Sequence, residues 1–258
     1  MARTPPKLSD VRSLNGPGAE AGRTGEVYPA VRSILFDGVD EYLDASSAAS
    51  SISFNDTPHT ISCWFNVPAT SAALQVIWSF ARSSATPSMY MLSIAASGSL
   101  YLYGRGDVSG EYPIGLHPVL FGSGYDDGAW HHAAITYDGS TDLNVYIDGA
   151  AQTPVVVGAG AMSPDILAVG ARRSSSATSL PLLGSVADFS IFERVLDATE
   201  LAKIATAPVL DYGALSPVLW SWMGDKDALA DIRDHGSNNG AVTLTNGVAG
   251  DLQDGAPS

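Results

Sequence analysis

The amino-acid sequence predicts an all-β fold, a two-sheet antiparallel sandwich. The first observation is the stretch 130–149, WHHAAITYDGSTDLNVYIDG, which has the pattern of a β-hairpin. The second is that roughly a dozen short runs of strand character follow one another along the chain, separated by Gly- and Pro-containing turns. The third is that only one segment, residues 197–206, has a convincing helical pattern. Many short strands with turns between them are typical of a sandwich.

The stretch 130–149 alternates between apolar and mixed side chains on both sides of a turn. In its second half Leu143, Val145 and Ile147 occupy every other position, as in a strand that is buried on one face. The Asp-Gly pairs at 138–139 and 148–149 supply residues that accept the positive φ of a tight turn. The stretch therefore predicts two antiparallel neighbours.

Other runs of strand character flank this hairpin on both sides. In the run near residue 60, Ile61, Cys63 and Phe65 share one face, so Cys63 is predicted to be a small buried hydrophobe. The Gly- and Pro-containing segment 104–128 is predicted to be a long loop. The remaining runs of strand character lie at 34–36, 42–43, 74–80, 89–94, 100–103, 165–171 and 182–196, and the segments 218–225 and 237–247 again have the character of strand and turn.

The predicted helix has signals at both of its ends. Asp197 can cap its start, and Glu200 three residues later completes a capping box. Pro208 ends it.

The composition and net charge of the chain argue against several classes of function. The 258 residues carry a net charge of −14, which argues against nucleic-acid partners and anionic membranes because both require a basic surface. One cysteine cannot form an internal disulfide. The N-terminal residues lack the apolar stretch of a signal peptide, and no segment is long and apolar enough to span a membrane. We therefore expect synthesis and folding in a cytoplasm.

The charge is distributed unevenly. Residues 1–32 hold five Lys or Arg and three Asp or Glu, whereas the remainder holds 8 and 24. The segment shows no sustained periodicity, so it is predicted to be an extended arm rather than a domain. It is either a solvated tail or, as the charge asymmetry favours, an arm that docks on a partner. Its cationic candidates for docking are Arg3, Lys7, Arg12 and Arg23.

Four segments together resemble the laminin-G-like, concanavalin A-like jelly-roll family. They read SILFDGVDEYLDA, HTISCWFNV, WHHAAITYDGSTDLNVYIDG and LLGSVADFSIFERVLDATEL, beginning at residues 33, 59, 130 and 182. The resemblance implies a jelly-roll over residues 33–207. Within the C-terminal segment 208–258, residues 220–247 resemble the segment that usually opens such a domain. We expect this segment to complete the same sandwich; the alternative is that it packs on a neighbour.

No catalytic constellation is evident in the sequence. Glycosidases on this sandwich use paired carboxylates on one strand, in a Glu-x-Asp-x-x-Glu pattern. Glu41 and Asp44 come nearest to it, beside a turn. His131 and His132 are adjacent on a predicted strand, so they point to opposite faces and cannot chelate one ion. We therefore expect no enzyme activity.

Calcium is the one metal that the resemblance raises. Related domains often bind it through carboxylates at strand ends, and Asp37 and Asp40 match the first motif. However, Ala187 stands where the family often has Asp. We expect structural turn roles for Asp37 and Asp40, no cofactor, and calcium as the alternative.

A laminin-G-like domain followed by such a C-terminal segment resembles structural proteins of tailed bacteriophages. This resemblance implies a non-enzymatic virion protein on the particle surface, with decoration of the head favoured over a tail position. Its partners would be other virion subunits, above all the major capsid protein, or further copies of itself, assembled in the host cytoplasm. The alternative is a carbohydrate-binding adhesion module that recognises cell-surface glycans.

Overall fold

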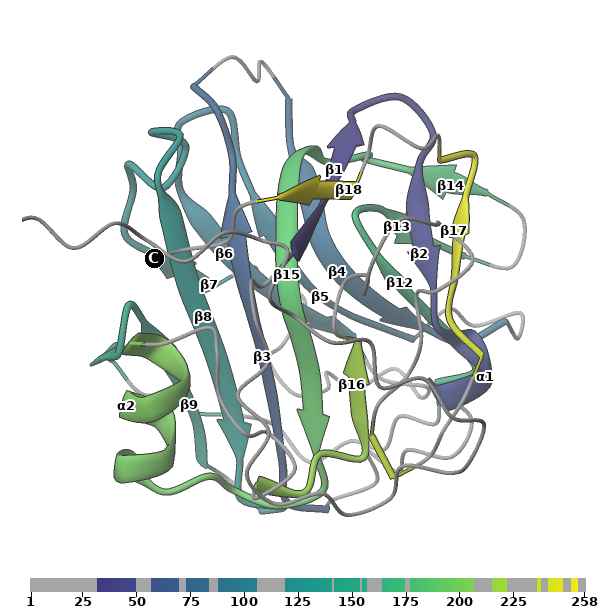
Figure 1. The fold of residues 1–258 in the computed structure, drawn as a ribbon. Coiled ribbons are helices and arrows are strands. Elements are labelled where there is room, and N and C mark those ends of the chain that lie inside the picture. The colour runs from purple at the N-terminus through teal and green to yellow at the C-terminus, as the bar shows by residue number, and fades with distance from the viewer. Residues whose placement is uncertain are drawn as a thin grey trace, which may run out of the picture.

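The computed structural model describes most of the sandwich. The described residues are 32–49, 57–69, 73–83, 88–105, 119–140, 142–153, 155–156, 164–174, 177–206, 215–221, 236–237, 241–247 and 252–254. The docking candidates Arg3, Lys7, Arg12 and Arg23 lie outside them. The predicted all-β fold is confirmed: two antiparallel sheets lie face to face (Figure 1).

The first sheet, called sheet A here, has the strand order β10-β9-β8-β3-β15-β1-β18, with β11 also pairing with β9 and β16 with β15. Its longest members, β3, β8 and β15, form its centre. The strands are β1 (Arg32–Asp37), β3 (His59–Asn66), β8 (Trp130–Tyr137), β9 (Asp142–Ile147), β10 (Ala150–Ala151), β11 (Val155–Val156), β15 (Leu183–Phe192), β16 (Leu219–Ser221) and β18 (Leu252–Asp254).

The second sheet, sheet B, has the order β17-β2-β12-β4-β5-β6-β7, and a separate two-stranded hairpin joins β13 to β14. The members of sheet B are β2 (Tyr42–Asp44), β4 (Gln75–Ala81), β5 (Met89–Ile94), β6 (Leu100–Arg105), β7 (Val119–Phe121), β12 (Ile166–Val169) and β17 (Thr243–Thr245). The hairpin consists of β13 (Arg172–Arg173) and β14 (Thr178–Ser179).

The main core lies between the two sheets. Strand alternation places Ile61, Cys63 and Phe65 of β3 in it, fully buried. Trp78 and Tyr90 of sheet B face them, with ring centroids 5.2 Å apart in an edge-to-face arrangement that aromatic pairs favour. Burial raises the pKa of the Cys63 thiol, so Cys63 is the small buried hydrophobe that the sequence predicts.

The predicted hairpin is confirmed as β8 and β9. Ala133 pairs with Ile147, and Tyr137 pairs with Leu143 at the turn end. The turn residue Gly139 has φ 86°, and at the far end Asp148 and Gly149 have φ 51° and 75°. The two Asp-Gly pairs therefore sit at the chain reversals that flank β9.

The predicted helix is α2 (Ala198–Thr206). Asp197 Oδ1 accepts the backbone N–H groups of Thr199 and Glu200, both at 2.8 Å, and Glu200 Oε2 accepts the N–H of Asp197 at 2.9 Å. This is the capping box that the sequence indicates. Leu201 and Ile204 are buried and lie in one cluster with Ala134 of β8. The helix thus covers part of the outer face of sheet A.

Three features differ from, or add to, the sequence expectation. A four-residue helix, α1 (Ser46–Ala49), follows β2. The predicted loop at 104–128 contains the last residues of β6 and all of β7. In the C-terminal segment, β16, β17 and β18 pair with β15, β2 and β1 respectively, so they join both sheets. No helix among the described residues is long and apolar enough to cross a membrane.

Candidate ligand-binding face

The calcium candidates Asp37 and Asp40 lie in the turn between β1 and β2. Asp37 Oδ1 accepts the N–H of Val39 at 2.8 Å, which is the bond of an Asx turn. The backbone carbonyl of Asp40 accepts a hydrogen bond from Asn246 Nδ2 at 3.3 Å. Among the described residues, no three His, Cys, Asp or Glu side chains are grouped so that they could hold a metal ion. Calcium binding therefore stays a prediction without a described ligand set.

The nearest carboxylate pair in the sequence has other partners. Glu41 is buried, and its Oε2 accepts the N–H of Asp37 at 2.8 Å, which braces the same turn. Asp44 accepts hydrogen bonds from Arg173 and from the N–H of Ser46. Both carboxylates thus have contacts that support the fold.

His131 and His132 point to opposite faces of sheet A, as the sequence predicts. The His131 ring lies 5.8 Å from that of Phe65, and its two nitrogens contact Asp148 at 2.9 Å and Asp127 at 3.1 Å. The backbone N–H of Ala129, which donates to Asp127 Oδ1, and then the contact with His131 hold the pKa of Asp127 below its usual range.

His132 lies on the outer face of sheet A and is shut off from solvent. Its Nε2 is 2.8 Å from Ser62 Oγ, and its ring centroid lies 5.1 Å from that of Trp64. Burial lowers the pKa of His132 to about 3. Ser62 is buried as well, so this Ser–His contact is closed to a substrate and serves packing.

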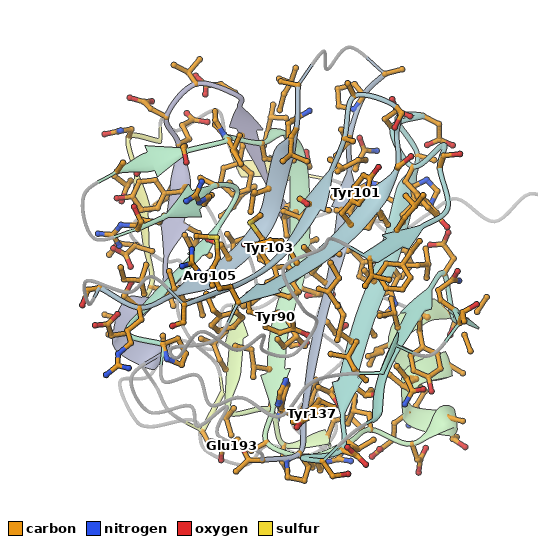
Figure 2. The ribbon with its side chains drawn as sticks, turned by 180° about the vertical axis from the view of Figure 1, so that it is seen from behind. Tyr90, Tyr101, Tyr103, Arg105, Tyr137 and Glu193 are labelled. Carbon is orange, nitrogen blue, oxygen red and sulfur yellow. The ribbon has the colours of Figure 1, made fainter. Side chains whose placement is uncertain are left out.

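The outer face of sheet B carries a different kind of surface. In β6, Leu100 and Leu102 point into the core, whereas the alternate residues Tyr101, Tyr103 and Arg105 point outward. Both tyrosines are half-buried and Arg105 is exposed. Figure 2, which is seen from behind relative to Figure 1, shows the three in a line along the strand. We call them the β6 row.

The strand next to the β6 row supplies an apolar floor. Met89 of β5 lies directly opposite Arg105, and Met91 lies opposite Tyr103. Met89, Met91 and Tyr103 belong to a cluster with Val76 and Leu180 that is separate from the main core. Met89 and Met91 are buried, so this floor supports Tyr103 from within the protein, and adaptable thioether side chains suit that packing.

The β13–β14 hairpin bounds one side of this floor. Ser79, an outward residue of β4, donates a hydrogen bond to the carbonyl of Ala171 at 2.9 Å and accepts one from the N–H of Arg173 at 3.3 Å. Directly after β14, the Leu180 carbonyl accepts the N–H of Val76 at 3.0 Å. The hairpin is thus fixed on the outer face of sheet B.

The β6 row cannot be recognised from the amino-acid sequence alone. Buried and exposed tyrosines look alike in one sequence, although the alternation of Tyr101 and Tyr103 with Leu100 and Leu102 already places the two rings on one face. Whether that face points into the core or to the outside of the sandwich depends on how β6 pairs with β5 and β7. The structure shows this pairing.

With this geometry in place, comparison with known proteins identifies the family. A laminin-G-like family model, described as the concanavalin A-like lectin/glucanases superfamily, matches residues 37–202. The chain therefore belongs to this family, as its four motifs suggest. No curated protein matches the chain.

Solved structures with the same fold include proteins with carbohydrate partners. The CBM40 of Ruminococcus gnavus IT-sialidase, bound to α2,3-sialyllactose, is 16% identical over 68% of this chain and 99% of its own, with a TM-score of 0.54. A candidate carbohydrate-binding protein from Bacteroides ovatus is 14% identical over 84% of this chain and 58% of its own, with a TM-score of 0.62. A heptameric pentraxin from Limulus polyphemus is 14% identical over 70% of this chain and 84% of its own, with a TM-score of 0.51. At these identities the likeness concerns the fold.

Proposed function

We propose that this protein binds carbohydrate without catalysis, through the outer face of sheet B. The observation that carries the proposal is the β6 row, in which Tyr101 and Tyr103 point outward and Tyr103 packs beside the buried methionines of β5. Ligand sites are mostly apolar and aromatic, with a few polar groups that fix orientation. Two outward-facing tyrosines followed by a guanidinium along one strand match that description.

The tyrosines also retain free polar groups. Neither the Tyr101 nor the Tyr103 hydroxyl forms a hydrogen bond within the described residues. A tyrosine offers an apolar ring and a polar tip, and a sugar offers apolar C–H faces and hydroxyl edges. Both halves of each side chain are therefore available to such a ligand.

The family and the fold support this proposal over a structural role alone. Two of the similar structures are a carbohydrate-binding module with bound sialyllactose and a candidate carbohydrate-binding protein. These similarities favour the carbohydrate-binding function, which the sequence suggested only as the alternative to a virion role.

The proposal keeps the expectation that the protein is not an enzyme. Three contacts support this expectation. Glu41 accepts a hydrogen bond from the backbone N–H of Asp37, and Asp44 accepts one from Arg173. The contact between Ser62 and His132 is buried. A direct check is to incubate the protein with β-glucans. Hydrolysis by the native chain that is lost in Glu41→Gln would contradict the hypothesis of a non-catalytic protein.

A glycan array followed by calorimetry tests the proposed site. We expect selective binding by the native chain, and a loss of affinity on the order of tenfold for Tyr101→Ala or Tyr103→Ala, since buried aromatic contacts dominate binding energy. Val195→Ala is the control, because Val195 is an exposed apolar residue in the turn before α2. Unchanged binding by both tyrosine variants would refute this site.

The bacteriophage role stays a prediction of the sequence. It rests on the resemblance of the four motifs and the C-terminal segment, and its docking candidates Arg3, Lys7, Arg12 and Arg23 lie outside the described residues. Deletion of residues 1–31 tests it: the sandwich should still fold, and incorporation into particles through the major capsid protein should be lost. Such a location is compatible with glycan binding, because a particle-surface protein can also bind cell-surface sugars.

A further inference from the structure

We infer that the carbohydrate ligand is anionic, and that Arg105 binds its carboxylate or sulfate group while the adjoining sugar rings lie on Tyr103 and Tyr101. This inference rests on the proposed function and names the ligand class for the same face.

The first support is the unpaired state of Arg105 among the described residues of an acidic protein. The chain holds 27 Asp and Glu against 13 Lys and Arg, so cations have many available partners. Arg173 pairs with Asp44, and Arg194 binds Glu200 through two hydrogen bonds of 2.7 and 2.8 Å. In contrast, Arg105 forms no ion pair and no side-chain hydrogen bond within the described part of the chain.

The second support is the register of sheet B. Met89 lies opposite Arg105, Ala81 lies opposite Met89, and Ile166 lies opposite Ala81. Directly opposed residues share a face and lie about 5 Å apart. The strip that runs from Arg105 across β5 and β4 to β12 is thus apolar, and none of these described residues supplies a carboxylate. The guanidinium is therefore available to an anion from outside.

The third support is the direction of the row. Alternate residues of a strand are spaced by about 6.5–7 Å, so the β6 row offers three successive contacts along one line. An extended glycan that follows β6 would place its acidic group at Arg105 and apolar ring faces on Tyr103 and Tyr101. Such a ligand should bind better than the isolated acidic monosaccharide.

The side-chain chemistry explains why the charge would be recognised strongly. A guanidinium presents a planar fork of donors that fits carboxylate and sulfate oxygens two at a time. A lysine at the same place would keep the charge but lose the paired geometry. Arg105→Gln and Arg105→Lys therefore separate loss of charge from loss of the fork.

The test measures dissociation constants by calorimetry for three matched oligosaccharides: neutral, carboxylated and sulfated. We expect the native chain to favour one or both acidic ligands by about tenfold or more, as for a hydrogen bond to a charged group. Arg105→Gln should abolish this preference and leave the neutral ligand within about twofold. Arg105→Lys should retain part of it. Methyl esterification of the carboxylate should remove the preference in the native chain.

The matched control is Lys203→Gln. Lys203 is exposed on α2, which packs on sheet A, so this variant removes one positive charge on the opposite side of the sandwich. It should keep the native preference. An equal loss in Lys203→Gln and Arg105→Gln would overturn the inference, because the effect would then come from net charge.

The remaining outcomes separate the inference from the proposed function. Equal binding of neutral and acidic ligands by the native chain, or an unchanged preference in Arg105→Gln, overturns the anionic ligand. If Tyr101→Ala still weakens binding in that case, the proposed function stands. Failure to bind any glycan overturns both. The carboxylated and sulfated ligands decide which anion is recognised.

Discussion

Two glycines in the described residues hold nearly the same backbone angle in unlike surroundings. Gly170 has φ 88° and Gly124 has φ 90°. A Cβ on Gly170 would lie 2.6 Å from the Phe36 ring, whereas a Cβ on Gly124 would meet nothing within 4 Å. Both positions require a left-handed backbone, but only Gly170 also leaves room for a core side chain.

Substitution of these glycines by alanine should therefore have unequal costs. Gly124→Ala should lower the free energy of unfolding by about 1–2 kcal/mol through backbone strain. Gly170→Ala should lower the free energy of unfolding by about 1–3 kcal/mol more than Gly124→Ala does, because the new methyl group overpacks the core against Phe36. Urea denaturation of both variants measures the difference. Equal losses would show that Phe36 can move aside at little cost.

Two buried histidines should make the fold sensitive to acid. Burial lowers the pKa of His132 to about 3 and that of His59 to about 4, and His59 packs between Tyr90 and Tyr137 of the two sheets. Because the unfolded chain takes up protons near pH 6.5 and the folded chain does not, the stabilisation is complete above that pH. It is lost progressively as the pH falls towards each folded-state pKa.

Each histidine should therefore reduce the free energy of unfolding by about 2 kcal/mol between pH 7 and pH 5. We expect His132→Gln to be less stable than the native chain at pH 7 but to lose less stability on acidification. Denaturation curves at both pH values measure this, and the acidic groups common to both chains cancel. Parallel losses in both chains would mean that the pKa of His132 is the same in the folded and unfolded states.

Among the elements, α2 has the most completely defined end. Its cap joins Asp197 to Glu200, and Glu200 also binds Arg194, whose Nη2 donates to the Leu215 carbonyl at 3.0 Å. Arg194 in turn holds the pKa of Glu200 below its usual range. At the other end, Trp64 Nε1 donates to the Ile204 carbonyl at 3.2 Å. The helix is therefore fixed at both ends on the outer side of sheet A.

Removal of the cap should weaken the helix measurably. Asp197→Ala leaves the N–H groups of Thr199 and Glu200 without their acceptor and should cost about 1 kcal/mol. Asp197→Ser keeps an oxygen at that position and should recover most of the loss. Chemical denaturation gives both values. An alanine variant as stable as the serine variant would show that water replaces the cap without penalty.

Elements with strong local signals are the ones that the sequence predicts. The β8–β9 hairpin and α2 each carry alternation or a capping box within about twenty residues. In contrast, β7 consists of three residues in a Gly- and Pro-containing segment and forms by pairing with β6. Helix α1 is a single turn, too short for a periodic signal. Such elements depend on tertiary contacts, which a local pattern does not contain.

The site follows the same division. The opposed orientations of His131 and His132 follow from strand alternation alone, and the turn role expected of Asp37 fits its Asx bond. The β6 row requires knowledge of which face is outside and of what lies opposite each residue. Met89 comes opposite Arg105 only through the register of β5 and β6, and that register is a property of the assembled sheet.

For the whole molecule, the C-terminal segment links both sheets. β17 pairs with β2 at one edge of sheet B, and β18 pairs with β1 at one edge of sheet A. Deletion of residues 241–258 should leave β1 and β2 as open edges, which favour association with other chains. We expect a lower free energy of unfolding and concentration-dependent aggregation, measured by denaturation and light scattering. A stable, monomeric truncated chain would show that these strands are dispensable.

The pairing of β1 with β18 also determines how the fold responds to tension. Arg32 lies opposite Asp254, and Ile34 lies opposite Leu252, so the outward ends of the first and last strands are neighbours. A pulling force applied at residues 32 and 254 would act across the strands and load their hydrogen bonds one after another, rather than all at once in shear. Because each bond contributes only about 1 kcal/mol net, this edge should open at low force, before the centre of either sheet yields.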